Sequence, residues 1–231
     1  MNVIDIIIII FVLIFGLLGL KRGAIKSLVQ LVGIIAITIL AFVLKDYLAN
    51  FLMDFMPFFN FSGPYAGITS MNILLYEMLS FVVIFILLYC ILNILITLSG
   101  LIEKLLKVTI ILAIPSKIMG AILGIIEGIV LVFIVSFIAL HIPQTETEIR
   151  SSKIAIVILE RTPFVGDTMK NTTVALENIH KILEKAKNAT NKNAANIEVL
   201  QELIRYNVVS KETVNKLIKD KKIDLGTTTI A

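Results

Sequence analysis

The sequence predicts an all-α protein that crosses a membrane several times, and three observations support this class: composition, long apolar stretches, and a polar tail with helical periodicity. Of the 231 residues, 58% are hydrophobic and 16% are charged, and the mean hydropathy is +0.96. Soluble domains contain roughly 45 to 50% apolar and about 25% charged residues. The composition therefore indicates an integral membrane protein.

Four apolar stretches are long enough to cross a bilayer as helices, at residues 3–20, 24–44, 73–98 and 118–140. A hydrocarbon core about 30 Å thick requires about 20 helical residues at 1.5 Å each. We therefore predict a four-helix transmembrane domain over residues 1–145. The first stretch has no basic residue before it and no small-residue cleavage site after it, so we expect it to remain as a span and not to be removed as a signal peptide.

The distribution of basic residues predicts the orientation of these spans. The first and third connections contain most of the basic residues near the membrane: Lys21, Arg22, Lys26, Lys104, Lys107 and Lys117. The second connection has only Lys45 at its start. Because Lys and Arg favour cytoplasmic loops, the first and third connections are predicted to face the cytoplasm, and the N-terminus and the tail to lie outside.

Residues 146–231 form a polar tail whose pattern predicts three short amphipathic helices. Apolar residues recur at three- and four-residue spacing over residues 176–186, 197–204 and 214–218. Pro163 and Gly166 interrupt the chain before the first helix, which Asp167 is placed to cap. Residues 188–196 and the turn YNVVS separate the helices. We expect the helices to pack on each other, on the bilayer surface or on a partner.

The connection between the second and third spans is rich in aromatic residues around Pro57 and the Gly63-Pro64 pair. Its aromatic residues between positions 51 and 65 are Phe51, Phe55, Phe58, Phe59, Phe61 and Tyr65. One interpretation is an ordinary loop held at headgroup level by these side chains. The other is a re-entrant loop beside a pore, since irregular backbone is tolerated at membrane depth only inside protein or beside water.

Catalytic and cofactor motifs do not occur in the sequence, so we expect neither enzymatic activity nor a cofactor. A single cysteine, Cys90, excludes an internal disulfide, and with only His141 and His180 beside it a Cys/His metal site is not expected. No GxSxG, HExxH or GxxxxGK[ST] motif is present. The tail lysines alternate with glutamates, so the pI of about 9.1 does not indicate nucleic-acid binding.

Glycines in the first and fourth spans predict close helix packing, because small residues let helix backbones approach in a membrane. They are Gly16, Gly19 and Gly23, and the doubled GxxxG stripe of Gly120, Gly124 and Gly128. Glu127 lies about nine residues into the fourth span, near the middle of the bilayer. At 100° per residue it shares a helix face with Gly120 and Gly124.

An acidic residue at the depth of Glu127 costs about 2.5 to 3.5 kcal/mol on insertion scales, so its carboxyl should face protein or water. No basic residue lies at the same depth in any span. We therefore expect a neutral carboxyl that is hydrogen-bonded to a hydroxyl or amide and is not ion-paired. The candidate partners are Thr38, Ser80, Asn93 and Thr97. Glu127 either fixes helix packing or lines a path and responds to protonation, and both interpretations remain open.

The opening NVIDIIIIIFVLIFGLLGLKRGAIKSLVQLVG, with Asp5, Gly16, Gly19 and the Arg22-Gly23 turn, resembles the colicin V production protein (CvpA) family of bacterial inner-membrane proteins. The segment GAILGIIEG is similar to the one that opens the family's last span, and SSKIAIVILERTP to the segment that follows it. The resemblance covers residues 1–165. It implies a four-span protein of the cytoplasmic membrane that is needed for colicin V production or export and for envelope homeostasis, without an established enzymatic activity.

Two function classes follow for this multi-pass protein, whose expected partners are the lipid bilayer and either another copy of the chain or another envelope membrane protein. The first is a scaffold or interaction protein, in which glycine faces assemble the spans and the tail recruits a partner. The second is a small oligomeric channel or transport component with a path lined by Glu127. The scarcity of other polar residues in the spans favours the scaffold.

Overall fold

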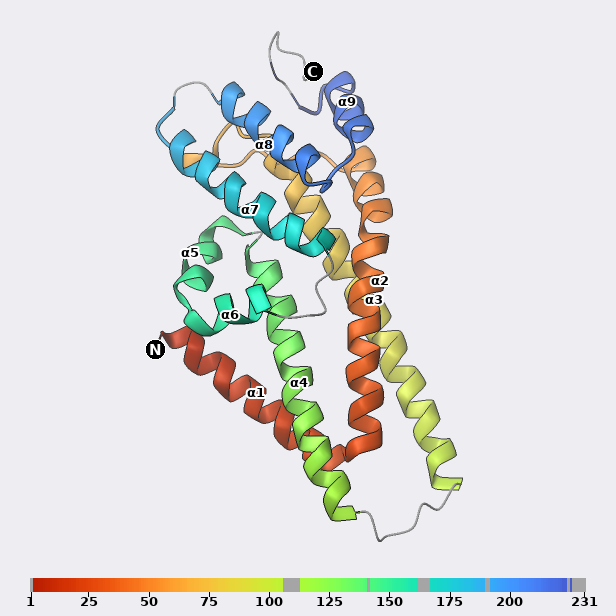
Figure 1. Cartoon of the computed structure of the whole chain (residues 1–231). Helices are drawn as coiled ribbons and strands as arrows, with labels where there is room; N and C mark the ends of the chain where they lie inside the picture. The colour runs from red at the N-terminus through yellow and green to blue at the C-terminus, as the bar shows by residue number, and fades with distance from the viewer. Residues whose placement is uncertain are drawn as a thin grey trace. The chain divides into compact units, whose positions relative to one another are not determined.

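The computed structural model describes residues 2–105, 113–140, 142–161, 167–189, 192–223 and 225, and these form helices joined by short connections (Figure 1). Lys107, His141, Pro163 and Gly166 lie outside the described residues. The predicted all-α class is confirmed. The elements are α1 (Val3–Arg22), α2 (Ala24–Phe55), the 3₁₀ turn η1 (Gly63–Tyr65), α3 (Met71–Leu105), α4 (Ala113–Leu140), α5 (Pro143–Ser151), α6 (Lys153–Arg161), α7 (Asp167–Ala186), α8 (Asn193–Arg205) and α9 (Lys211–Lys219).

Four helices in the described part of the chain are long and apolar enough to cross a membrane, as predicted. Their apolar portions are Val3–Arg22, Ala24–Phe55, Met71–Thr97 and Pro115–Leu140. The second helix continues well past the predicted end at residue 44. The predicted end was set by Lys45 and Asp46, where the apolar stretch stops. A change of polarity does not end a helix, and residues 45–55 contain no Gly or Pro to interrupt it.

The chain divides into two compact units, and α2 and α3 each contribute to both. The first unit comprises Met1–Val43 and Val82–Phe164, and the second comprises Leu44–Phe81 and Val165–Ala231. The predicted division between a membrane domain, residues 1–145, and a tail, residues 146–231, concerns the chain in its membrane and stays a prediction.

In the first unit, α1 packs along α4, while α5 and α6 fold back near the start of α1 and the end of α4 (Figure 1). Gly23 alone separates α1 from α2 and has a φ of 81°. A left-handed conformation of this kind favours glycine, which has no Cβ to clash with the backbone. The backbone N–H of Ala24 then donates a hydrogen bond of 3.1 Å to Ser116 Oγ of α4. The turn is thus fixed to the helix that α1 packs on.

Asp5 joins the beginning of α1 to the beginning of α6. Its Oδ2 accepts from the Asn2 backbone N–H at 2.9 Å, which completes a capping box on α1. Its Oδ1 accepts from the Ser152 hydroxyl at 2.6 Å and from the Ile154 N–H at 3.2 Å. One buried carboxylate therefore satisfies donors at two helix N-termini, where negative charge is favourable. The segments α5 and α6 were not predicted as separate helices from the residues.

We expect Asp5→Ala to destabilise the protein by about 2 kcal/mol, because it removes a helix cap and leaves the buried Ser152 hydroxyl without an acceptor. Thermal denaturation of the purified protein in detergent measures this change. Asp5→Asn is the matched control: it keeps Oδ1 as the acceptor for Ser152 and Ile154 but replaces Oδ2 with an amide that cannot accept from the Asn2 N–H, and it should lose less than half as much. Equal losses for both variants would show that the hydrogen bonds to Oδ1 do not stabilise the fold.

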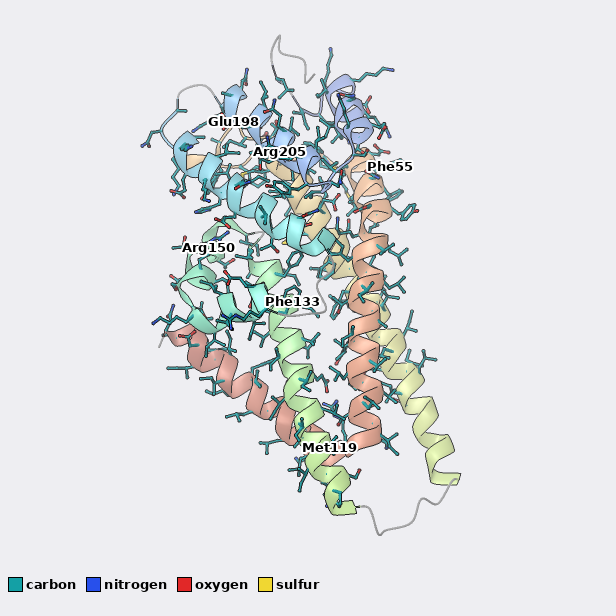
Figure 2. All side chains as sticks on the ribbon, viewed as in Figure 1. Phe55, Met119, Phe133, Arg150, Glu198 and Arg205 are labelled. Atoms are coloured by element: carbon teal, nitrogen blue, oxygen red, sulfur yellow. The ribbon has the colours of Figure 1, made fainter. Side chains whose placement is uncertain are left out.

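In the second unit, the predicted amphipathic helices of the tail are confirmed as α7, α8 and α9. Their apolar faces are buried, including Leu176, Ile179, Leu183, Val199, Leu200, Leu203, Val214 and Leu217. The predicted YNVVS turn ends α8, with Asn207 in the left-handed region at a φ of 53°. Figure 2 shows Glu198 and Arg205 on α8, whereas the labelled side chains on the apolar helices are Phe55, Met119 and Phe133.

The aromatic connection after α2 folds against its own unit. The Tyr76 hydroxyl donates to the Pro57 carbonyl at 2.7 Å, and the Asn72 side chain bonds both the N–H and the carbonyl of Phe59. Asn196 belongs to α8 and not to the predicted linker. Its Oδ1 accepts from the Ser70 N–H at 3.0 Å, and its Nδ2 donates to the Gly67 carbonyl at 2.9 Å. Side chains of α3 and α8 thus bond several backbone polar groups of this connection.

Candidate functional site

The glycines predicted to mediate packing lie opposite one another where α1 crosses α4. We call the set Gly16, Gly19, Gly23, Gly120, Gly124 and Gly128 the glycine seam. A Cβ added to Gly19 would lie 2.9 Å from both the Gly120 carbonyl carbon and Gly124 Cα. A Cβ on Gly124 would lie 3.0 Å from Gly19 Cα. These neighbours are backbone atoms, so the two helices touch main chain to main chain at this point.

Other positions of the seam are less tightly enclosed. A Cβ on Gly16 would meet the Ile125 side chain at 3.0 Å, and one on Gly128 would meet Phe15 Cβ at 3.0 Å and Val12 Cα at 3.1 Å. A flexible side chain can move aside, whereas the backbone of a helix cannot. The closest packing is therefore centred on Gly19, Gly120 and Gly124.

Glu127 lies at one end of this close approach and forms an ion pair with Arg22. Arg22 Nη1 lies 2.9 Å from Glu127 Oε2 and 3.3 Å from Oε1. The Glu127 side chain is 1% exposed and the Arg22 side chain is 26% exposed. The pair thus holds a fully buried carboxylate on α4 and a guanidinium that reaches it from the end of α1.

The expectation that Glu127 bonds a hydroxyl or amide and not a basic residue was wrong. It compared the depths of backbone positions and ignored side-chain reach. Helical side chains lean toward the N-terminus of their own helix. Since α1 and α4 run in opposite directions, the Arg22 side chain leans toward the start of α1 and the Glu127 side chain leans toward the start of α4. The two side chains therefore lean toward each other and meet. Of the proposed partners, Thr38, Asn93 and Thr97 instead donate to backbone carbonyls of their own helices at 2.6 to 2.8 Å.

Arg22 therefore has a second role besides that of a predicted topology determinant. Three exposed lysines lie near Arg22. Lys21 and Lys26 are close to Arg22 in the chain, and Lys117 follows Ser116, which lies next to Gly23. Lys104 belongs to α3, and Lys107 lies outside the described residues. The basic end of the first unit consists of exposed lysines beside one partly buried arginine.

The second unit contains another buried ion pair, which sequence reasoning missed. Lys45 Nζ bonds the Glu77 carboxylate, and it also bonds Asp46 Oδ1 at 2.7 Å. Lys45 is 6% exposed and Glu77 is 3% exposed. The sequence feature that could have indicated this pair is the position of the two residues: Lys45 follows the second span and Glu77 lies near the start of the third, so the two residues lie at the same end of two consecutive antiparallel spans. A buried charge needs a partner, so each residue pointed to the other.

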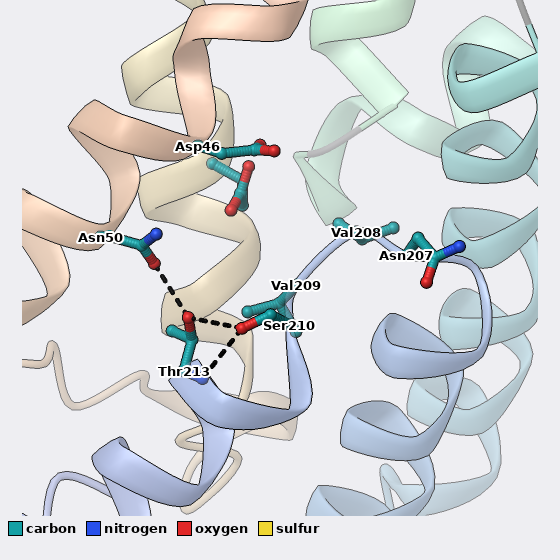
Figure 3. A pocket seen from close by; sticks show the side chains of 8 residues that line it. Asp46, Asn50, Asn207, Val208, Val209, Ser210 and Thr213 are labelled. Atoms are coloured by element: carbon teal, nitrogen blue, oxygen red, sulfur yellow. Dashed lines mark hydrogen bonds between the residues drawn. The ribbon is translucent and has the colours of Figure 1, made fainter.

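A polar pocket of about 250 Å³ opens beside this pair (Figure 3). Its lining is Asp46, Asn50, Glu77, Asn207, Val208, Val209, Ser210 and Thr213. Thr213 Oγ1 donates to Asn50 Oδ1 at 3.2 Å, and the Thr213 N–H donates to Ser210 Oγ at 3.0 Å. The first bond joins the start of α9 to α2 along one side of the pocket, and the second caps α9.

Each of the two sites holds a buried carboxylate bonded to a cation. At the second site Lys45 also bonds the exposed carboxylate of Asp46. Within the described residues, no group of three or more His, Cys, Asp or Glu side chains could hold a metal ion. What the two ion pairs can do is fix helices to each other at a definite register.

Comparison with known proteins identifies a family for most of the chain. The profile of the family described as Colicin V production protein matches residues 4–163, which include the glycine seam, Arg22, Glu127 and both residues of the Lys45–Glu77 pair. Searches of curated proteins and of solved structures gave no match. A multi-pass helical membrane protein with this match over well over half of its length belongs to the colicin V production protein family.

Proposed function

We propose that the chain is a non-enzymatic membrane scaffold that supports colicin V production or export and the upkeep of the cell envelope. The observation that carries the proposal is the Arg22–Glu127 pair at the glycine seam: the mid-span carboxylate is fully buried and neutralised by a neighbouring helix. A residue that lined a path would need water or an ion beside it. The family match supports the link to colicin V production.

The proposed location is the bacterial cytoplasmic membrane, with the N-terminus and the tail on the outer side. The support is the cluster of basic residues at the first and third connections. In intact cells, a cysteine at Asn193 in a Cys90→Ser background should react with a membrane-impermeant thiol reagent. Protection of this cysteine until the cells are lysed would reverse the proposed orientation.

Purification in mild detergent, with a mass measurement and identification of co-isolated proteins, tests the scaffold proposal. We expect a defined complex that contains a second copy of the chain or an envelope membrane protein. Gly124→Ile should remove the partner, since it separates α1 from α4. A monomer that fully supports colicin V production without any partner would contradict a scaffold role.

One observation favours the second candidate, a small oligomeric channel or transport component. Glu77 borders a pocket large enough to hold water. If the protein conducts, proteoliposomes should show an ion or solute flux that Glu77→Gln alters and that Glu127→Gln leaves unchanged. Equal leakage from protein-free and protein-containing vesicles would remove this candidate.

A further inference from the structure

The segment that contains α9 is attached to the C-terminal end of α2. Lys222 Nζ donates to the Met53 carbonyl, to the Asp54 carbonyl at 2.6 Å and to the Met56 carbonyl at 3.3 Å. Lys216 Nζ pairs with Asp54 Oδ2 at 2.6 Å. The last carbonyls of a helix lack intrahelical partners and attract cations. Lys222 therefore binds the end of α2 as a C-terminal cap.

The length of α2 places this attachment at the level of lipid headgroups. The helix has 32 residues, which correspond to about 48 Å at 1.5 Å per residue. A bilayer measures about 40 to 45 Å including its headgroups. A membrane-spanning α2 that begins beside Lys21 and Arg22 thus ends in the opposite headgroup layer. Phe55, which is 74% exposed, and Phe51, which is 55% exposed, suit this interfacial level.

Three lysines of this segment, Lys211, Lys219 and Lys221, have exposed side chains. Among the described residues, these side chains make no hydrogen bond or ion pair. We call them the α9 lysine face. The opposite side of α9 is buried through Val214 and Leu217. Glu212 and Asp220 offset only part of the positive charge of residues 211–223.

Lys221 also occupies a backbone conformation that usually belongs to glycine. Its φ is 55°, and its N–H donates to the Ile218 carbonyl at 3.0 Å, so it stands just after the end of α9. Glycine is the common residue at this position because a Cβ is unfavourable in the left-handed region. The chain thus carries a positive side chain at a position where glycine would be more stable. An exposed lysine that is kept at a position where it destabilises the local backbone indicates a binding role for its side chain.

We propose that the α9 lysine face binds the phosphate groups of anionic phospholipids in the leaflet that contains the C-terminal end of α2. The lysines supply the positive charge, α2 fixes them at the depth of the phosphates, and the exposed aromatic residues Phe51 and Phe55 lie in the adjacent interface. Each basic residue near an anionic membrane surface contributes about five-fold to affinity at moderate ionic strength. The surface therefore selects anionic over zwitterionic lipid around the protein.

Native mass spectrometry of the full chain, titrated in detergent with phosphatidylglycerol or phosphatidylcholine, tests the proposal. The wild-type protein should bind phosphatidylglycerol preferentially, and the preference should weaken at high salt. Lys211→Gln/Lys219→Gln/Lys221→Gln should lower the phosphatidylglycerol affinity by about five-fold per lysine and leave phosphatidylcholine binding unchanged. The control Lys153→Gln/Lys181→Gln/Lys185→Gln makes the same change in net charge elsewhere in the tail and should keep the preference.

The single variant Lys221→Gly separates binding from folding. We expect a higher thermal midpoint than wild type, because glycine suits the left-handed position, together with a phosphatidylglycerol affinity lowered about five-fold. A general loss of structure would lower both quantities. The proposal is overturned if the α9 triple variant keeps its lipid preference, if the control loses as much, if inorganic phosphate displaces the lipid, or if the triple variant loses only a co-purified acidic protein.

Discussion

Gly19→Ala and Gly124→Ala are each expected to destabilise the protein by about 2 to 3 kcal/mol, in the upper range for overpacking of a filled interior. A methyl group on either residue would collide with backbone of the opposite helix, at 2.9 Å from Gly124 Cα in the first case and 3.0 Å from Gly19 Cα in the second. Relief requires α1 and α4 to separate, which also lengthens the Arg22–Glu127 contact. Titration of the purified protein with a denaturing detergent, monitored by the loss of helix content, measures the change in stability.

Gly33→Ala is the matched control for these substitutions. Gly33 also lies within a membrane helix, and a Cβ there would approach Leu92 Cδ1 and Cδ2, at 2.5 and 2.8 Å. Those atoms end a flexible side chain that can change rotamer, so the cost should stay below about 1 kcal/mol. A control as destabilised as Gly19→Ala would show that any added methyl group disturbs these helices, and that the seam is not specially close.

The two residues of the Arg22–Glu127 pair should respond unequally to substitution. Arg22→Met leaves a fully buried carboxylate without its cation, and removing one partner of a buried pair costs about 3 to 5 kcal/mol. Glu127→Gln keeps a carbonyl oxygen that accepts from Arg22, whose partly exposed guanidinium can also reach water, so it should cost about 1 kcal/mol. The same denaturation measurement gives both values.

The double variant Arg22→Met/Glu127→Met completes a mutant cycle and should recover most of the stability lost in Arg22→Met, because no unpaired charge remains. Lys21→Met serves as the control, since Lys21 is exposed beside Arg22 and should change stability by less than about 0.5 kcal/mol. If the losses of the two single variants simply add in the double variant, the ion pair does not couple α1 to α4.

Much of the helical architecture could be predicted from the sequence, because hydrophobic length and periodicity are local properties. The four spans and the three amphipathic helices of the tail follow from them. The end of α2 does not, since Lys45 and Asp46 change polarity without breaking the helix. The short helix α6 also depends on a distant group: the Asp5 carboxylate, which caps it.

The pairing of charged side chains could not be predicted by comparing depths along the helix axes. Glu127 was recognised as a buried carboxylate, but its partner depends on the direction in which Arg22 leans and on the antiparallel packing of α1 and α4. Lys45 and Glu77 were not predicted to pair, yet both are buried and they bond each other. Likewise, the alternating charges of the tail concealed the α9 lysine face, because only the fold shows which lysines remain without a partner among the described residues.

The proposed scaffold role is tested most directly by the amount of colicin V released from cells whose only copy of the protein carries Glu127→Gln, at wild-type abundance in the membrane. The substitution preserves the size of the side chain and a hydrogen bond from Arg22 but removes titration at the buried carboxyl of α4. If the pair serves helix assembly, release should equal that of wild type, whereas Gly124→Ile should abolish it. Loss of release by Glu127→Gln, with assembly intact, would contradict the scaffold account and favour a transport path through Glu127.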